Sequence, residues 1–237
     1  MNLKRSTLVL LIFLCSCQGW SKNQTFKTTD LNSYGIYGKV KCYTETSQKV
    51  NCKDGWNCLH DTTEHYLITV KRYFGNNGIL DSIEYFSENN MLIQTVKYDY
   101  NNKNNIILFQ YDKTGNEIKF SRQISFKDSI LKTETIDSKT KKTISVSQTK
   151  YKNKLVLWQK SKELQKKLYS EYIYERNEKG LETQIKTIFG YENDKNENTV
   201  KIVYLEFDSY GNWIKRIEYN SDKTNCLLKT RVFTFYK

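Results

Sequence analysis

The stretch Tyr111-Asp112-Lys113-Thr114-Gly115-Asn116 decides the fold, because it places a compact polar turn between two alternating segments. Gly and Asn accept the positive φ that tight turns need, and an Asp side chain caps the backbone two residues further on. After the turn, one side of the chain is apolar and the other polar, a period of two that predicts a β-hairpin. The apolar side carries Ile118, Phe120, Ile124 and Phe126, and the polar side carries Lys119, Ser121, Gln123 and Ser125.

The same pattern recurs along the chain. Aromatic residues close successive segments at Tyr73, Tyr85, Tyr98 and Tyr111, in steps of 12, 13 and 13 residues. Each is followed by a polar turn, and further turn signals continue to residues 221–222. Such spacing predicts an all-β fold, an antiparallel meander of about 10–13 short strands. Open sheets of that width curl, so we expect a strongly curled single sheet or a partly closed barrel built from hairpin repeats. The one helical turn that we expect lies within residues 160–170, where Leu164 and Leu168 are four apart.

Composition supports a folded, repetitive domain. The 237 residues contain no Pro, whereas an average chain of this length has roughly a dozen. Apolar residues make up 38% and aromatic residues 14%, which is too much for a disordered chain. The net charge of +12 attracts polyanions, but the lysines are dispersed and interleaved with Glu. We therefore interpret them as a soluble charged face and do not expect nucleic acid as a partner.

The N-terminus has the pattern of an export signal. Lys4 and Arg5 precede an apolar run at 7–14, which is far shorter than the ~20 residues of a membrane span. The following Leu14-Cys15-Ser16-Cys17 resembles the lipobox of bacterial lipoproteins, with cleavage after Ser16 and a lipid on Cys17. The alternative is an ordinary secretory signal. We therefore divide the chain into a lipoprotein signal peptide at 1–16, a tether at 17–35 and a β-repeat domain at 36–237.

Four further cysteines are candidates for disulfides, since an even number in an exported protein favours oxidation. Three lie in a Cys-rich insertion at 42–58, and three pairings are open. We favour Cys52 with Cys58, which leaves a pair that can form only if the first and last parts of the fold meet. The four candidates are Cys42, Cys52, Cys58 and Cys226.

Two stretches resemble a known repeat. They are the turn that begins at Tyr111, with Asp112, Gly115 and Asn116, and Phe207-Asp208-Ser209-Tyr210-Gly211-Asn212-Trp213. Both are similar to YD repeats, the Rhs-type β-hairpin unit, in the form found in lipoproteins of Bacteroidetes-type bacteria. The similarity extends, with degenerate copies, over residues 36–237. It implies an exported all-β protein of unassigned function and supplies no catalytic residues.

No catalytic motif stands out. His60 and His65 are the candidates for a metal site, but their spacing matches no standard zinc site, and a solvated loop is the favoured interpretation. There is no Gly-x-Ser-x-Gly elbow and no phosphate-binding Gly loop. Asp112 and Asp208 occupy equivalent turn positions, so we interpret them as capping residues and not as paired catalytic carboxylates. We expect no cofactor.

These observations predict a non-catalytic cell-envelope lipoprotein that binds or scaffolds a protein or glycan partner. The lipid would attach it to the bacterial membrane. The periplasmic face of the outer membrane is favoured over the cell surface, because Gln18-Gly19-Trp20 lacks the acidic run that resembles a surface-export signal in such bacteria. One alternative is a hydrolase or metal-dependent enzyme of envelope polymers with a site near residues 60–65. Another is an accessory or immunity partner of a secretion system.

Overall fold

The computed structural model describes residues 31–50, 66–102, 105–191, 194–221 and 226–237. These residues form an all-β structure, which confirms the predicted fold class. A single short 3₁₀ helix, η1 (Leu31–Tyr34), precedes the strands. The fourteen strands are β1 (Val40–Val50), β2 (Tyr66–Phe74), β3 (Leu80–Phe86), β4 (Leu92–Asn102), β5 (Asn105–Asp112), β6 (Glu117–Lys127), β7 (Ile130–Asp137), β8 (Thr143–Lys152), β9 (Leu155–Glu163), β10 (Leu168–Arg176), β11 (Glu182–Tyr191), β12 (Asp194–Phe207), β13 (Trp213–Asn220) and β14 (Cys226–Phe235).

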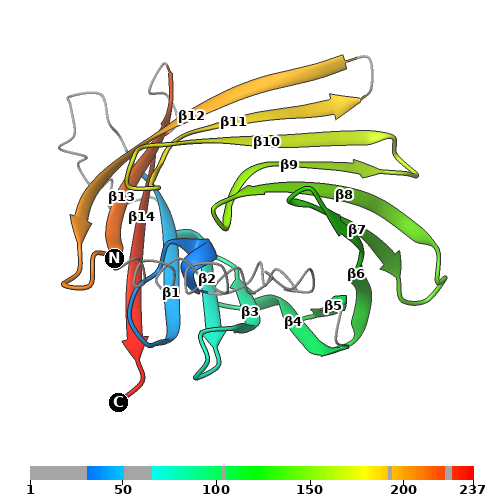
Figure 1. Cartoon of the computed structure of the whole chain (residues 1–237), viewed down its shortest axis with the longest axis horizontal. Helices are drawn as coiled ribbons and strands as arrows, with labels where there is room; N and C mark the ends of the chain where they lie inside the picture. The colour runs from blue at the N-terminus through cyan, green and yellow to red at the C-terminus, as the bar shows by residue number, and fades with distance from the viewer. Residues whose placement is uncertain (1–30, 51–65, 103–104, 192–193, 222–225) are drawn as a thin grey trace, which may run out of the picture.

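The strands form an antiparallel meander that closes into a barrel, with β1 pairing to β14. Figure 1 shows β1, β13 and β14 side by side on one side of the barrel, while the sheet curves through β4 to β7 and returns through β8 to β12. Closure removes both sheet edges and satisfies the backbone groups that an open sheet would expose. The predicted strand number of about 10–13 was slightly low.

Five hairpin turns share one geometry. In the turn 112–116, the amide of Asp112 donates to the carbonyl of Asn116, and the amide of Gly115 donates back to the carbonyl of Asp112. The fourth position has a positive φ, 84° at Gly115, where an L side chain would be strained. The same pair of hydrogen bonds closes the turns 75–79, 87–91, 177–181 and 208–212.

The orientation of β6 differs from the simple expectation that a curled sheet buries its apolar face. Ser121 and Gln123 line the interior, whereas Ile124 is on the outside and 55% exposed. A barrel of fourteen strands is too wide for side chains from its walls to fill, so its interior does not have to be apolar. As far as Gln123, the polar face of this strand therefore points inward. The register shift between Gln123 and Ser125 reverses the sides, so that Phe126, opposite the lumen residue Leu131, faces the interior.

The main hydrophobic core lies at the end of the barrel that carries η1. It combines buried side chains of β1 to β4, among them Tyr43, Phe74 and Leu80, with Ile36 from the approach to β1. Leu31 and Tyr34 of η1 pack against it, so the last part of the predicted tether belongs to the folded domain. The amide of Leu31 donates to the carbonyl of Gly78, which fastens η1 to the turn between β2 and β3. No helix in the described ranges is long and apolar enough to span a bilayer.

Three local expectations require correction. Residues 42–50 of the predicted Cys-rich insertion belong to β1, and 51–65 lie outside the described residues. Cys42 and Cys226 form no disulfide with each other: β1 and β14 do pair, but Cys226 is opposite Val50, eight residues along β1 from Cys42. At about 3.3 Å per residue they are about 26 Å apart, far beyond disulfide reach. Residues 160–170 form the β9–β10 hairpin instead of a helical turn.

Candidate functional site: the barrel lumen

The barrel encloses a cavity of about 660 Å³ at the end that carries η1. Its wall takes side chains from most of the strands, and Tyr34 and Gly35 border it at the rim. This volume is within the range of small-molecule binding pockets. The lining combines charged, polar and aromatic side chains with six aliphatic ones, so it contains far more charged and polar groups than an ordinary protein core.

One wall of the lumen is charged. Nε of Arg231 on β14 donates to Glu45 on β1 at 2.7 Å, and both side chains are largely buried. Arg216 on β13 lies 3.3 Å from Glu182, and Arg176 lies 2.9 Å from the same carboxylate. The Arg231–Glu45 pair joins the first strand to the last, and each of these five side chains has an opposite charge within 3.3 Å, as burial requires.

Glu218 completes this network behind the lining. Its carboxylate pairs with Arg216 and lies 2.9 Å from Lys229. With Arg72, the wall holds five cationic side chains against the three carboxylates of Glu45, Glu182 and Glu218. The described part of this wall thus has an excess of two positive charges, which favours an anionic ligand.

Trp213 is the centre of this charged wall. The guanidinium of Arg231 lies 3.6 Å from a ring centroid of Trp213, and that of Arg216 lies 4.3 Å away. Tyr204 packs edge-on at 6.2 Å between centroids. Cation–π contacts of this kind are worth more when water is excluded. Trp213 therefore helps to position both arginines, and because it is only 4% exposed it offers little surface to a ligand.

Arg72 differs from the other lumen arginines. Its guanidinium lies 5.3 Å from the ring centroid of Tyr43 and 5.9 Å from that of Tyr34. Its Nε and Nη1 are buried and have no hydrogen-bond partner among the described residues, and the Tyr43 hydroxyl has none either. Leaving buried donors unpaired costs about 1–3 kcal/mol each, so this corner of the lumen would gain from an acceptor.

The electrostatics of the lumen keep Glu45 ionised. Burial alone would raise the pKa of its carboxyl, but Arg231, Arg72, Lys229 and Arg216 outweigh burial and lower the pKa to about 2. Because the pKa falls on folding, ionised Glu45 stabilises the fold fully above its ordinary pKa of 4.5, and this stabilisation is lost as the pH falls toward 2. Desolvation raises the pKa of Tyr98, so that phenol stays protonated at neutral pH.

The opposite wall carries small hydroxyl side chains, which we call the hydroxyl belt. Ser121 and Thr135 share a hydrogen bond of 2.8 Å across β6 and β7, and Ser161 and Ser170 share another across β9 and β10. Strand register places Thr133 opposite Ser147 and Ser147 opposite Ser161, so that these three side chains form a row on one face of the sheet. Small side chains leave the lumen open on this side and present donors and acceptors to it. The belt comprises five residues that line the cavity, Ser121, Thr133, Thr135, Ser147 and Thr149. Ser161 and Ser170 continue it on the same face of the sheet by strand register.

The residues singled out from the sequence are mostly outside the lumen. Asp112 and Asp208 accept backbone hydrogen bonds in their own turns, and Tyr111 lies under the amino group of Lys97, 5.3 Å from the ring centroid. Asn212 binds the backbone of Tyr37 through both atoms of its side-chain amide. Among the predicted repeat residues, Trp213 lines the lumen.

Other sequence candidates lie outside the described residues: Cys17, Cys52, Cys58, His60 and His65. Within the ranges that are described, no cluster of three or more His, Cys, Asp or Glu side chains could hold a metal ion.

The lumen arginines and glutamates were not recognised from the sequence. Arg216 and Glu218 alternate with apolar residues on β13, as do Lys229 and Arg231 on β14, and such alternation is equally typical of a solvated face. A signal was available in the spacing, since charged residues stand two apart on each of the last two strands, as Arg216 and Glu218 on β13 and as Lys229 and Arg231 on β14. Closure of the barrel, and not local pattern, converted this face into an interior.

The chain matches no protein-family model and no curated protein sequence.

Proposed function

We propose that this protein is a non-catalytic binding protein of the bacterial cell envelope and that its ligand is a saccharide held in the barrel lumen. The observation that carries the proposal is the cavity of about 660 Å³ with a charged wall facing a hydroxyl belt. Sugars offer many hydroxyl groups, which match Ser and Thr side chains, and apolar ring faces, which match Tyr. The excess of positive charge favours a saccharide with acidic groups.

The cellular setting is part of the same proposal. The basic start, the short apolar run and the Leu14-Cys15-Ser16-Cys17 pattern support export and a lipid on Cys17. The resemblance of the turns at 111–116 and 207–213 to YD repeats supports a lipoprotein of Bacteroidetes-type bacteria. A lipid-anchored barrel on the periplasmic side would meet soluble envelope saccharides directly.

Two adjacent substitutions test the site. Thr149→Trp would place an indole in the lumen, whereas Lys150→Trp places the same group on the outside of β8. We expect the wild type and the Lys150→Trp variant to bind acidic saccharides on an array of envelope glycans. The Thr149→Trp variant should lose at least tenfold in affinity because its indole fills the ligand's space.

Folding must be checked in parallel, and circular dichroism with a thermal melt serves this purpose. If folded Thr149→Trp protein binds the same saccharides as well as the wild type does, the lumen is not the site. If the wild type binds no saccharide on the array, the proposed ligand class is wrong.

A further inference from the structure

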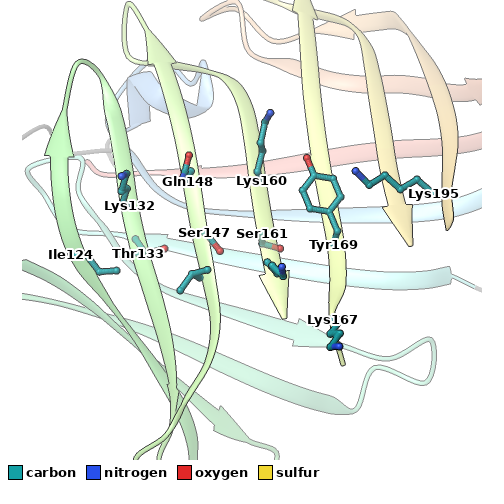
Figure 2. A pocket seen from close by; sticks show the side chains of 12 residues that line it. Ile124, Lys132, Thr133, Ser147, Gln148, Lys160, Ser161, Lys167, Tyr169 and Lys195 are labelled. Carbon is teal, nitrogen blue, oxygen red and sulfur yellow. The ribbon is translucent and has the colours of Figure 1, made fainter. Parts of the chain in front are cut away.

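A second concave site lies on the outside of the barrel, over β6 to β12. It is a groove of about 520 Å³, which we call the lysine groove, and Thr133, Ser147 and Ser161 of the hydroxyl belt contribute to its lining. Figure 2 shows Lys132, Gln148 and Lys160 projecting from neighbouring strands on the same side, with Tyr169 and Lys195 at one end. Thr133 and Ser147 border both the groove and the lumen, but the lysines of the groove do not border the lumen, so the charge of the groove can be considered on its own.

The charge of the lysine groove is strongly unbalanced. Five lysines line it, and one carboxylate, that of Glu171, pairs with Lys160 at 3.0 Å. Lys132 and Lys167 have no ion pair or hydrogen bond with any described residue. The five lysines are Lys132, Lys160, Lys162, Lys167 and Lys195.

At one end of the groove, a lysine lies over a tyrosine ring, and a glycine stands between them. Lys195 on β12 lies with its amino group 4.5 Å from the ring centroid of Tyr169 on β10, and Gly190 on β11 lies between them in the strand register. A Cβ at Gly190 would be 2.1 Å from the carbonyl oxygen of Asp194, so only glycine fits. The missing side chain leaves the space through which Lys195 reaches Tyr169.

The floor of the groove is apolar. Ile124 and Val146 line it and are 55% and 37% exposed, which is high for aliphatic side chains. The lysine side chains add their hydrocarbon stems to this surface and keep their amino groups at the rim. An apolar floor below a cationic rim matches a molecule that has both a hydrocarbon chain and an anionic head.

We propose that the lysine groove binds an anionic lipid, with the acyl chain over Ile124 and Val146 and the acidic headgroup beside Lys160 and Lys195, whose amino groups both lie next to residues of β10. An uncharged amphiphile would lack the attraction at the rim, and a free anion would leave the floor uncovered. Both parts of the ligand are therefore needed for full affinity.

The test uses dodecanoate below its critical micelle concentration, measured by isothermal titration calorimetry at low salt. We expect saturable binding with a stoichiometry near one per protein. Dodecyl maltoside, which has the chain without the charge, and inorganic phosphate, which has the charge without the chain, should each bind at least tenfold more weakly. Binding of phosphate as strong as that of dodecanoate would show a simple anion site and overturn the proposal.

Variants locate the binding. Lys160→Glu and Lys195→Glu should each weaken dodecanoate binding at least fivefold, while Lys113→Glu, an exposed turn lysine, should not change it. Ile124→Ser should weaken binding, and Ile93→Ser is the matched control because Ile93 is 50% exposed on β4. Equal affinity in groove and control variants, or no saturable binding by the wild type at 1 mM dodecanoate, would refute the proposal.

Discussion

Two turns of nearly the same sequence have very different roles in this barrel. In the first of the two, residues 112–116, the side-chain amide of Asn116 donates hydrogen bonds to the side chains of Asp112 and Thr114 within the turn, and Asn116 is exposed. In the last turn, residues 208–212, Asn212 is 1% exposed. Its Oδ1 accepts from the amide of Tyr37 at 2.6 Å, and its Nδ2 donates to the Tyr37 carbonyl at 3.0 Å. One local motif thus closes a hairpin in both places, and in the second it also connects that hairpin to the segment that precedes β1.

The largest expected difference between the two turns concerns these asparagines. Asn212→Ala removes two hydrogen bonds to the backbone of Tyr37 and leaves both groups poorly satisfied, so we expect a loss of about 2 kcal/mol. For a domain of this size that corresponds to a melting temperature lower by about 4–8 °C. Asn116→Ala, the matched variant, should change stability by about 0.5 kcal/mol or less. Thermal melts of both variants measure the difference. Equal losses of stability would contradict a stabilising role for the contact between Asn212 and Tyr37.

A smaller and equal effect is expected at the glycines of the two turns. Gly115 and Gly211 have φ values of 84° and 86°, and a Cβ at either position would meet nothing within 4 Å. Gly→Ala should therefore cost about 1 kcal/mol at each site through backbone strain alone. Urea unfolding of the two variants measures both costs. A clearly larger cost at Gly211 would mean that the connection to Tyr37 also depends on the backbone of the turn.

The smallest expected effect is a local titration in the first turn. The side-chain hydrogen bond from Thr114, followed by the amide of Asn116, lowers the pKa of Asp112 to about 2. Because the pKa falls on folding, the capping interaction is complete above the ordinary value of 3.8 and is lost as the pH falls toward 2. Carboxyl carbon shifts in an NMR titration should give this midpoint, and Thr114→Ala should raise it. An unchanged midpoint in that variant would show that the hydroxyl does not contribute.

The sequence could predict the local features of these turns but not the contacts of the lumen. The turns, the strand periodicity and the all-β class could be predicted because hydrogen bonds within five residues and alternation along a strand are local properties. The sequence also placed Trp213 in the second YD-like turn motif but did not indicate that Arg216 and Arg231 would both contact its ring. Arg231 is eighteen residues further along the chain, and the contact exists because β13 and β14 pair.

The lumen and the lysine groove also combine a local property that the sequence predicts with a tertiary one that it does not. Lys132 and Thr133 are neighbours in the sequence, yet Thr133 lines the lumen as part of the hydroxyl belt, whereas Lys132 borders the outer groove and not the lumen. Alternation predicts that they face opposite sides of the sheet. It does not predict which side becomes the interior, since that depends on the direction in which the whole sheet curls.

By itself, the sequence determined the short strands, the capped turns with their Gly or Asn at positive φ, and the antiparallel order of neighbouring strands, because each depends on contacts within one hairpin. The tertiary structure decided the closure of β1 on β14, the inward orientation of the charged face, and the connection of Asn212 to Tyr37. These depend on the summed twist and number of fourteen strands, which bring together residues separated by most of the chain.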